Sequence, residues 1–251
     1  MFPIKDNNPK ILTAYATFGI IALNIIAWLL LQGAGSEPRM SATVCTLGVM
    51  PGELLQTLPA GTSLQIGQNL YCILGDSPNW YTLFSYMFLH GGWLHLLGNL
   101  WFLWVFGRSV EDSMGPFRFI VFYLASGLAA AMLQVIFAPA SAIPMVGASG
   151  AIGGVMGAYL MLYPRVKVTM LIWLIVIITT IRVPAMFMLG YWLLVQFVGG
   201  IGSIGNDSTG VAFWAHIGGF VAGAAMVWLF VNPRLLRKHP YYGWGSSKPD
   251  A

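Results

Sequence analysis

The chain has 251 residues, of which 57% are hydrophobic and 8% are charged, and its formal net charge is +4. Soluble globular domains have about 45–50% apolar and about 25% charged residues, so this composition excludes an ordinary soluble domain and predicts a polytopic membrane protein. The length suits about six transmembrane helices in an all-α fold, arranged as one domain over residues 1–251. The basic residues cluster at the ends of apolar segments, where membrane orientation explains them, so we expect no nucleic-acid partner.

Apolar segments define the expected spans. In chain order they are residues 11–31, 94–106, 117–137, 149 to about 163, 183–199 and 211–231. Residues 33–90 form a long connection rich in Gly and Pro, and loops of this length are usually functional or disordered. Residues 168–181 are too short for a straight crossing, which needs about 20 residues, so we interpret them as a connecting stretch that can merge with the fifth span.

The distribution of basic residues orients these spans. Of the 12 Lys and Arg residues, all except Arg39 fall on one side of this path. By the positive-inside rule that side is cytoplasmic, so we expect a multi-pass protein of the cell membrane with both termini inside. Cys45 and Cys72 then share the outward loop, where a disulfide can form in an oxidising compartment. Two separate thiols would look the same in sequence.

A glycine-rich stretch over residues 145–157 leads into the fourth span. Ser149, Gly153 and Gly157 recur there every four residues and therefore share one helix face. Such a stripe of small side chains allows a second helix to approach almost backbone to backbone, a packing mode common inside bilayers. Ser149 stands at the outer end of this stripe.

The last span carries a matching face. His216, Gly219 and Gly223 lie there at positions i, i+3 and i+7, so packing this face on the first stripe places an imidazole beside the Ser149 hydroxyl. Alone, the serine could cap a helix and the histidine could satisfy a hydrogen bond. Together they have the arrangement of a serine activated by a base, and ionisable residues inside spans are costly and usually functional.

Three motifs in chain order carry a family resemblance. They are His95-Leu96-Leu97-Gly98-Asn99, Gly147-Ala148-Ser149-Gly150, and Ala215-His216 followed by Gly219 and Gly223. They resemble the HxxxN, GxSG and AHxxGxxxG motifs of the rhomboid intramembrane serine proteases, and the likeness runs from about Trp80 to Val231. The resemblance implies a rhomboid-like bundle of six transmembrane helices with a core over about residues 80–231 and an outward loop at 33–90.

The chemistry expected from these residues is acyl transfer. Ser149 would be the nucleophile and His216 the general base. The spans hold no Asp or Glu near them, so we infer a Ser-His dyad rather than a triad. As the resemblance implies, His95 and Asn99 would donate to the oxyanion together with the Ser149 backbone N–H. Hydrogen bonding between the second and fourth spans is the alternative role for His95 and Asn99.

The expected function is that of an intramembrane serine endopeptidase that cuts transmembrane segments of membrane proteins near the outer face. Its partners would be transmembrane protein substrates and the lipid bilayer, and the oligomeric state stays open. The alternative is a catalytically silent rhomboid-like protein that binds client transmembrane helices. No cofactor or metal is expected, because the chain has no HExxH sequence and no pair of aspartates within spans.

Three further features have predicted roles outside the chemistry. Residues 199–210 contain repeated glycines and short polar residues before the last span, so we expect a mobile outer lid. His90 is expected to support the outer loop by hydrogen bonding. Residues 107–115, with Glu111, resemble a structural turn of the family on the cytoplasmic side, although Ser113 replaces the arginine that some members have.

Overall fold

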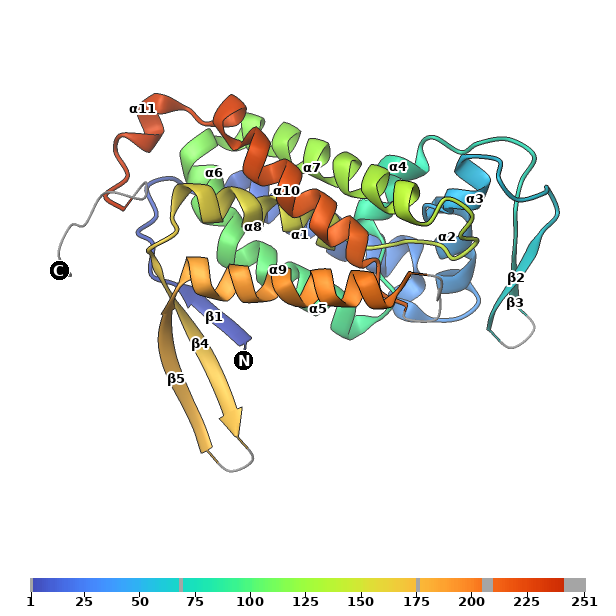
Figure 1. Ribbon diagram of the computed structural model, residues 1–251, viewed down its shortest axis with the longest axis horizontal. Helices are drawn as coiled ribbons and strands as arrows, with labels where there is room; N and C mark the ends of the chain where they lie inside the picture. Colours follow the sequence, from blue (N-terminus) through green and yellow to red (C-terminus); the bar gives the residue numbers. More distant parts are fainter. Residues whose placement is uncertain (1, 68–69, 175–176, 205–209, 242–251) are drawn as a thin grey trace.

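The computed structural model describes residues 2–67, 70–174, 177–204 and 210–241 and is mostly helical. The long helices run side by side along the long axis of the molecule, and two small sheets lie beside them (Figure 1). The helices are α1 Tyr15–Ile26, α2 Arg39–Leu47, α3 Pro51–Leu54, α4 Thr82–Ser85, α5 Trp93–Phe102, α6 Arg108–Met114, α7 Pro116–Phe137, α8 Ser149–Leu162, α9 Ala185–Gly202, α10 Phe213–Phe230 and α11 Pro233–Leu236.

Two of the helical runs are longer than these bounds indicate. A π-helical segment, Ala27–Leu31, extends α1, and another, Leu103–Gly107, joins α5 to α6. Among the described residues, α7, α9 and α10 are long and apolar enough to cross a membrane, and the apolar runs Tyr15–Leu31 and Ser149–Leu162 are shorter. The expectation of a membrane protein rich in apolar helices is confirmed, whereas the number of six crossings stays a prediction.

The prediction of a mostly helical fold is confirmed, but the all-α class is wrong, because the described residues also form strands. Strands β1 Phe2–Asp6, β4 Lys167–Leu174 and β5 Ile177–Pro184 form one antiparallel sheet in the order β1-β4-β5, and β2 Ser63–Gly67 pairs with β3 Leu70–Ile73. The stretch predicted as a connection at 168–181 is therefore a β-hairpin. Its many β-branched residues favour extended backbone, and pairing along the hairpin satisfies backbone groups that a loop would leave to water.

The stretch 107–115, predicted as a turn, is helical through Met114. The Glu111 carboxylate in this stretch binds another helix. It accepts hydrogen bonds from the backbone N–H groups of Ala16 and Thr17 at 2.9 and 2.8 Å. These N–H groups lie in the first turn of α1, where the helix itself offers no acceptors. The structural role expected for Glu111 thus takes the form of a cap on α1. The helical run ends at Gly115, whose φ of +81° favours glycine.

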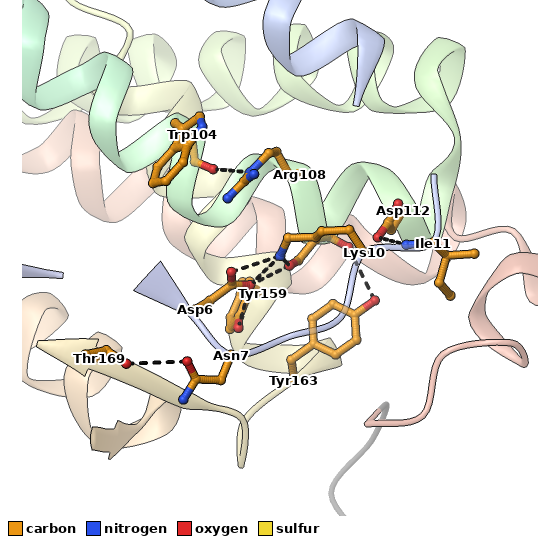
Figure 2. A network of polar contacts seen from close by, with 11 residues as sticks. Asp6, Asn7, Lys10, Ile11, Trp104, Arg108, Asp112, Tyr159, Tyr163 and Thr169 are labelled. Atoms are coloured by element: carbon orange, nitrogen blue, oxygen red, sulfur yellow. Dashed lines mark hydrogen bonds and ion pairs between the residues drawn. The ribbon is translucent and has the colours of Figure 1, made fainter. Parts of the chain in front are cut away.

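A buried polar network ties the N-terminal segment to the start of α6 and the last turns of α8 (Figure 2). Nζ of Lys10 lies 2.8 Å from Oδ2 of Asp6, which also accepts hydrogen bonds from the hydroxyls of Ser109 at 2.5 Å and Tyr159 at 3.2 Å. Burial lowers the pKa of Lys10, and the neighbouring Asp6 carboxylate opposes that shift. The network fixes the end of α8 that lies opposite Ser149.

The long loop at residues 33–90 is held by covalent and backbone bonds. A disulfide joins Cys45 of α2 to Cys72 of β3, with the two Cα atoms 5.4 Å apart, so the alternative of separate thiols does not hold here. Val49 and Met145 form an isolated antiparallel bridge. This bridge connects the loop to the stretch that immediately precedes Ser149, so the start of α8 is held as well.

Candidate active site

Ser149 and His216 meet at the starts of two packed helices. Ser149 is the first residue of α8, and His216 lies in the first turn of α10. Nε2 of His216 is 2.8 Å from Oγ of Ser149. The two side chains that the sequence placed on facing stripes are therefore in hydrogen-bond contact.

The glycine faces explain why the two helices come so close. A methyl group added at Gly219 would overlap the backbone carbonyl of Gly150, and one added at Gly223 would overlap that of Gly154. On α8, a methyl group at Gly153 would lie 2.9 Å from the His216 carbonyl oxygen, and one at Gly157 would overlap the Phe220 carbonyl. All four glycines predicted to pack are thus at backbone-to-backbone contacts.

Two of the glycines in contact were not singled out from the sequence. A methyl group added at Gly154 would overlap Ser126 of α7, and one added at Gly218 would lie 2.7 Å from Cβ of Leu133 on the same helix. The signal was present in the adjacent pairs 153–154 and 218–219, since two successive glycines open two neighbouring helix faces. Helix α7 packs against this second glycine face of α8 and α10, so both helices also contact α7.

His95 faces the same space as the Ser149 hydroxyl. Its Nδ1 accepts a hydrogen bond of 3.2 Å from the Gly91 backbone N–H, so the neutral ring carries its proton on Nε2. A methyl group added at Gly147 would lie 2.8 Å from this Nε2 and 3.4 Å from Oγ of Ser149. A ring donor and the hydroxyl therefore flank one small space, which Gly147 leaves open.

Asn99 presents a second donor. Its side chain is only 7% exposed, and its Nδ2 has no hydrogen-bond partner among the residues that the structure describes. Leaving a buried donor unpaired costs about 1–3 kcal/mol, so such a group needs a reason. The absence of a partner within 2–67, 70–174, 177–204 and 210–241 argues against interhelical hydrogen bonding as the role of Nδ2.

A cavity of about 1150 Å³ joins these groups to the loop at residues 33–90. Ser149, His216, His95 and Asn99 all line it, together with residues of α2 and of the stretch 137–146. The cavity therefore offers space for a peptide segment beside the hydroxyl and both donors.

Polar and aromatic neighbours of the site were missed from the sequence. Oε1 of Gln196 on α9 lies 2.7 Å from Nδ1 of His216, and the Trp192 ring is 5.9 Å from the imidazole ring, centroid to centroid. At the start of α10, Phe137 stacks on Trp214 at 3.7 Å. The available signal was Gln196 itself, because an amide within an apolar span is costly unless it is paired.

The expected roles of His90 and of the outer segment change in part. The main chain of His90, rather than its ring, exchanges two hydrogen bonds with the Gln32 side chain, at 2.6 and 2.8 Å. The first residues of the predicted lid are the last turn of α9, and Gly199 packs against the Phe213 ring. Residues 205–209 of that segment lie outside the described residues.

Comparison with known proteins identifies relatives. A family model described as a Rhomboid domain matches residues 77–233. The chain is 35% identical over 210 residues to the rhomboid protease GluP of Bacillus subtilis. The aligned region covers 84% of this chain and 34% of that protein. It is 40% identical over 77 residues to the chloroplastic Rhomboid-like protein 11 of Arabidopsis thaliana, covering 31% of this chain and 27% of the relative. The chain thus spans about a third or less of these two relatives, and the domain match shows that it belongs to the rhomboid family.

Proposed function

We propose that the chain is an intramembrane serine endopeptidase that cuts transmembrane segments near the outer membrane face with a Ser149–His216 dyad. The observation that carries this proposal is the 2.8 Å contact between Oγ of Ser149 and Nε2 of His216 beside an open cavity. Family membership supports intramembrane proteolysis as the reaction class. A silent relative that only binds helices would have no need of this contact.

The proposed reaction has two steps. Nε2 of His216 takes the Ser149 proton while Oγ attacks the peptide carbonyl, and the imidazolium then protonates the leaving amine as the C–N bond breaks. The N-terminal part of the substrate stays as an ester on Ser149. In the second step His216 takes a proton from water, the hydroxide attacks the ester, and the proton returns to Oγ as the acid is released.

The oxyanion of both steps would be stabilised by three donors. They are Nε2–H of His95, Nδ2–H of Asn99 and the backbone N–H of Ser149. The Gly91 hydrogen bond to Nδ1 supports the donor role of His95, and the unpaired Nδ2 supports that of Asn99. The first turn of α8 adds peptide dipoles that favour negative charge at its N-terminus.

We propose six crossings with both termini in the cytoplasm. They are Tyr15–Leu31, residues 93–114, α7, α8, α9 and α10. Support comes from the buried network at one end, which joins the N-terminal segment to α6, and from the hydrogen bond of 2.8 Å between the Asn232 backbone N–H and the Ser113 carbonyl oxygen. The first residues and α11 therefore lie at the same end, opposite the disulfide-bonded loop.

The substrate class proposed here is a single-pass membrane protein with small residues at the cut. A peptide bond in a regular helix is shielded, so the segment must unwind locally where water reaches the cavity. The space beside the hydroxyl is small, because a methyl group added at Gly147 would lie 2.8 Å from Nε2 of His95 and 3.4 Å from Oγ of Ser149. This narrow space favours small residues on either side of the cut.

Removing an oxyanion donor is expected to reduce turnover. For Asn99→Ala or His95→Ala we expect kcat to fall by about 10²–10³ with a smaller change in KM, because the donor contacts strengthen in the transition state. Initial rates on a tagged transmembrane substrate measure the effect. Leu97→Ala on the same helix is the matched control, since Leu97 is exposed and is not among the residues that line the cavity. Wild-type kcat in both donor variants would return His95 and Asn99 to structural roles.

Cleavage itself is the test of the proposed function. The purified protein in lipid vesicles is incubated with a panel of tagged transmembrane segments, and the products are mapped by mass. We expect cuts near the outward end of the segment, next to small residues, with no products from Ser149→Ala. Cuts confined to soluble domains or to the cytoplasmic end would contradict the proposal. Binding of segments without any cut would favour the silent alternative.

A further inference from the structure

Gln196 places an amide side chain in a mostly apolar helix. It belongs to α9, where its side chain is 8% exposed. A buried amide in a membrane span needs hydrogen-bond partners, because neither lipid nor bulk water replaces them. Its Oε1 finds one at 2.7 Å, on Nδ1 of His216.

This contact selects one form of the His216 ring. For Nε2 to accept the proton of Ser149, that nitrogen must be bare, and the neutral ring then carries its proton on Nδ1. Nδ1–H in turn needs an acceptor, and the side-chain oxygen of Gln196 lies where that acceptor is required. The opposite form would turn Nε2–H toward the Ser149 hydroxyl and leave His216 without the lone pair that a base needs.

We propose that Gln196 is a positioning residue that holds His216 in the form with the proton on Nδ1. The proposal rests on the proposed function of the Ser149–His216 pair. Gln196 would act through the imidazole and would not touch the substrate. It would do so in both steps, because the imidazolium formed after proton uptake still donates from Nδ1 to the same oxygen.

Neighbouring side chains also restrict the orientation of the His216 ring. Trp192, four residues before Gln196 on α9, lies against the imidazole at 5.9 Å and against the Phe220 ring at 5.9 Å. Helix α9 thus supplies a hydrogen bond to one ring nitrogen and an aromatic wall to the ring, while α8 supplies Ser149 to the other nitrogen. The ring cannot rotate without losing both hydrogen bonds.

A neutral amide also suits a site inside a membrane. A buried carboxylate would carry a large desolvation cost, whereas an amide oxygen accepts the same hydrogen bond without a full charge. The difference has a measurable consequence. An amide orients the ring with little electrostatic effect on its protonation, while a carboxylate at the same place would stabilise the imidazolium.

The protonation form can be measured without any substrate. The chain has four histidines, so the ring nitrogens of protein labelled with ¹⁵N-histidine can be assigned by comparison with His216→Ala. At neutral pH we expect the wild-type His216 proton on Nδ1, and a mixture of forms in Gln196→Leu. A wild-type proton on Nε2, or an unchanged form in Gln196→Leu, would overturn the proposal. An inactive wild type that keeps the proton on Nδ1 would contradict only the protease function.

The pH dependence of kcat/KM would not change if Gln196 had a purely structural role, so kinetics supply a second test. For Gln196→Leu we expect about a tenfold fall in kcat, the scale of one neutral hydrogen bond, with little change in KM. Gln196→Glu keeps an acceptor and should restore most of kcat, while moving the acidic limb of the kcat/KM profile to higher pH because the carboxylate stabilises the imidazolium. Gly190→Ala, whose methyl group meets nothing within 4 Å, is the matched control on α9.

The two variants together distinguish positioning from packing. If Gln196→Leu fails to fold, two measurements still test the proposal. They are the position of the His216 ring proton in the wild type and the pH profile of kcat/KM for Gln196→Glu. A Gln196→Glu protein with the pH profile of the wild type, or a Gln196→Leu protein with wild-type kcat, would overturn the assignment.

Discussion

Replacing Ser149 with Ala, or His216 with Ala, is expected to abolish cleavage while the protein still folds and inserts. Removing the nucleophile or its base in a serine protease costs about 10⁶ in kcat. When two residues act as a unit, the effects of their substitutions on kcat do not add. The double variant should therefore be no slower than either single variant. Initial rates of the purified variants on a reporter transmembrane segment measure both effects.

Ser203→Ala is the matched control for this prediction. Ser203 lines the same cavity, but its hydroxyl donates to the Gly200 carbonyl oxygen at 2.8 Å and has no contact with a histidine among the described residues. We expect it to cleave like the wild type. Retained cleavage in purified Ser149→Ala or His216→Ala would rule out the dyad, whatever Ser203→Ala does.

Gly219→Val is expected to cost both stability and activity. Any side chain at Gly219 would overlap the Gly150 carbonyl, a backbone atom that cannot turn aside as a flexible side chain could. Overpacked sites lose about 1–3 kcal/mol and occasionally more, and this one should lie at or above that range. Because the displaced helix α10 also carries His216, a shift of about 1 Å would reduce the rate by about 10² as well.

Thermal unfolding in detergent and initial rates on the reporter segment check this prediction. Gly190→Val on α9 is the control, because a methyl group at Gly190 meets nothing within 4 Å. If Gly219→Val melts and cleaves like Gly190→Val, the close packing of α8 and α10 is not needed. We expect Gly157→Val to behave like Gly219→Val, since its added methyl group would overlap the Phe220 carbonyl.

The sequence predicted the helix pairing that builds the candidate site. Glycines on one face permit a close approach, and the positions of Ser149 and His216 on those faces then determine that they meet. The roles of the two residues stay proposals, but their contact follows from spacing alone. The packing distances did not follow from the spacing: Gly153 and Gly157 occupy equivalent positions on the stripe, whereas the contact at Gly157 is the tighter of the two.

Other features depend on partners that are distant in the sequence. Glu111 appeared to belong to a turn because its acceptor role involves Ala16 and Thr17 of another helix. The hairpin β4–β5 pairs with β1 at the opposite end of the chain, so a reading of residues 168–181 alone could not find its partner. The contact of Gln196 with His216 likewise depends on which helix α9 faces.

Labelling the nucleophile tests whether Ser149, activated by His216, forms a covalent ester. Purified protein is treated with a fluorophosphonate, which reacts with activated serines, and the modified peptide is mapped by mass while cleavage of the reporter segment is followed in parallel. We expect one adduct on Ser149, loss of cleavage in proportion to labelling, and no adduct in His216→Ala. Full cleavage by protein whose Ser149 is completely modified, or an adduct on another residue that accounts for the lost activity, would contradict this role of Ser149.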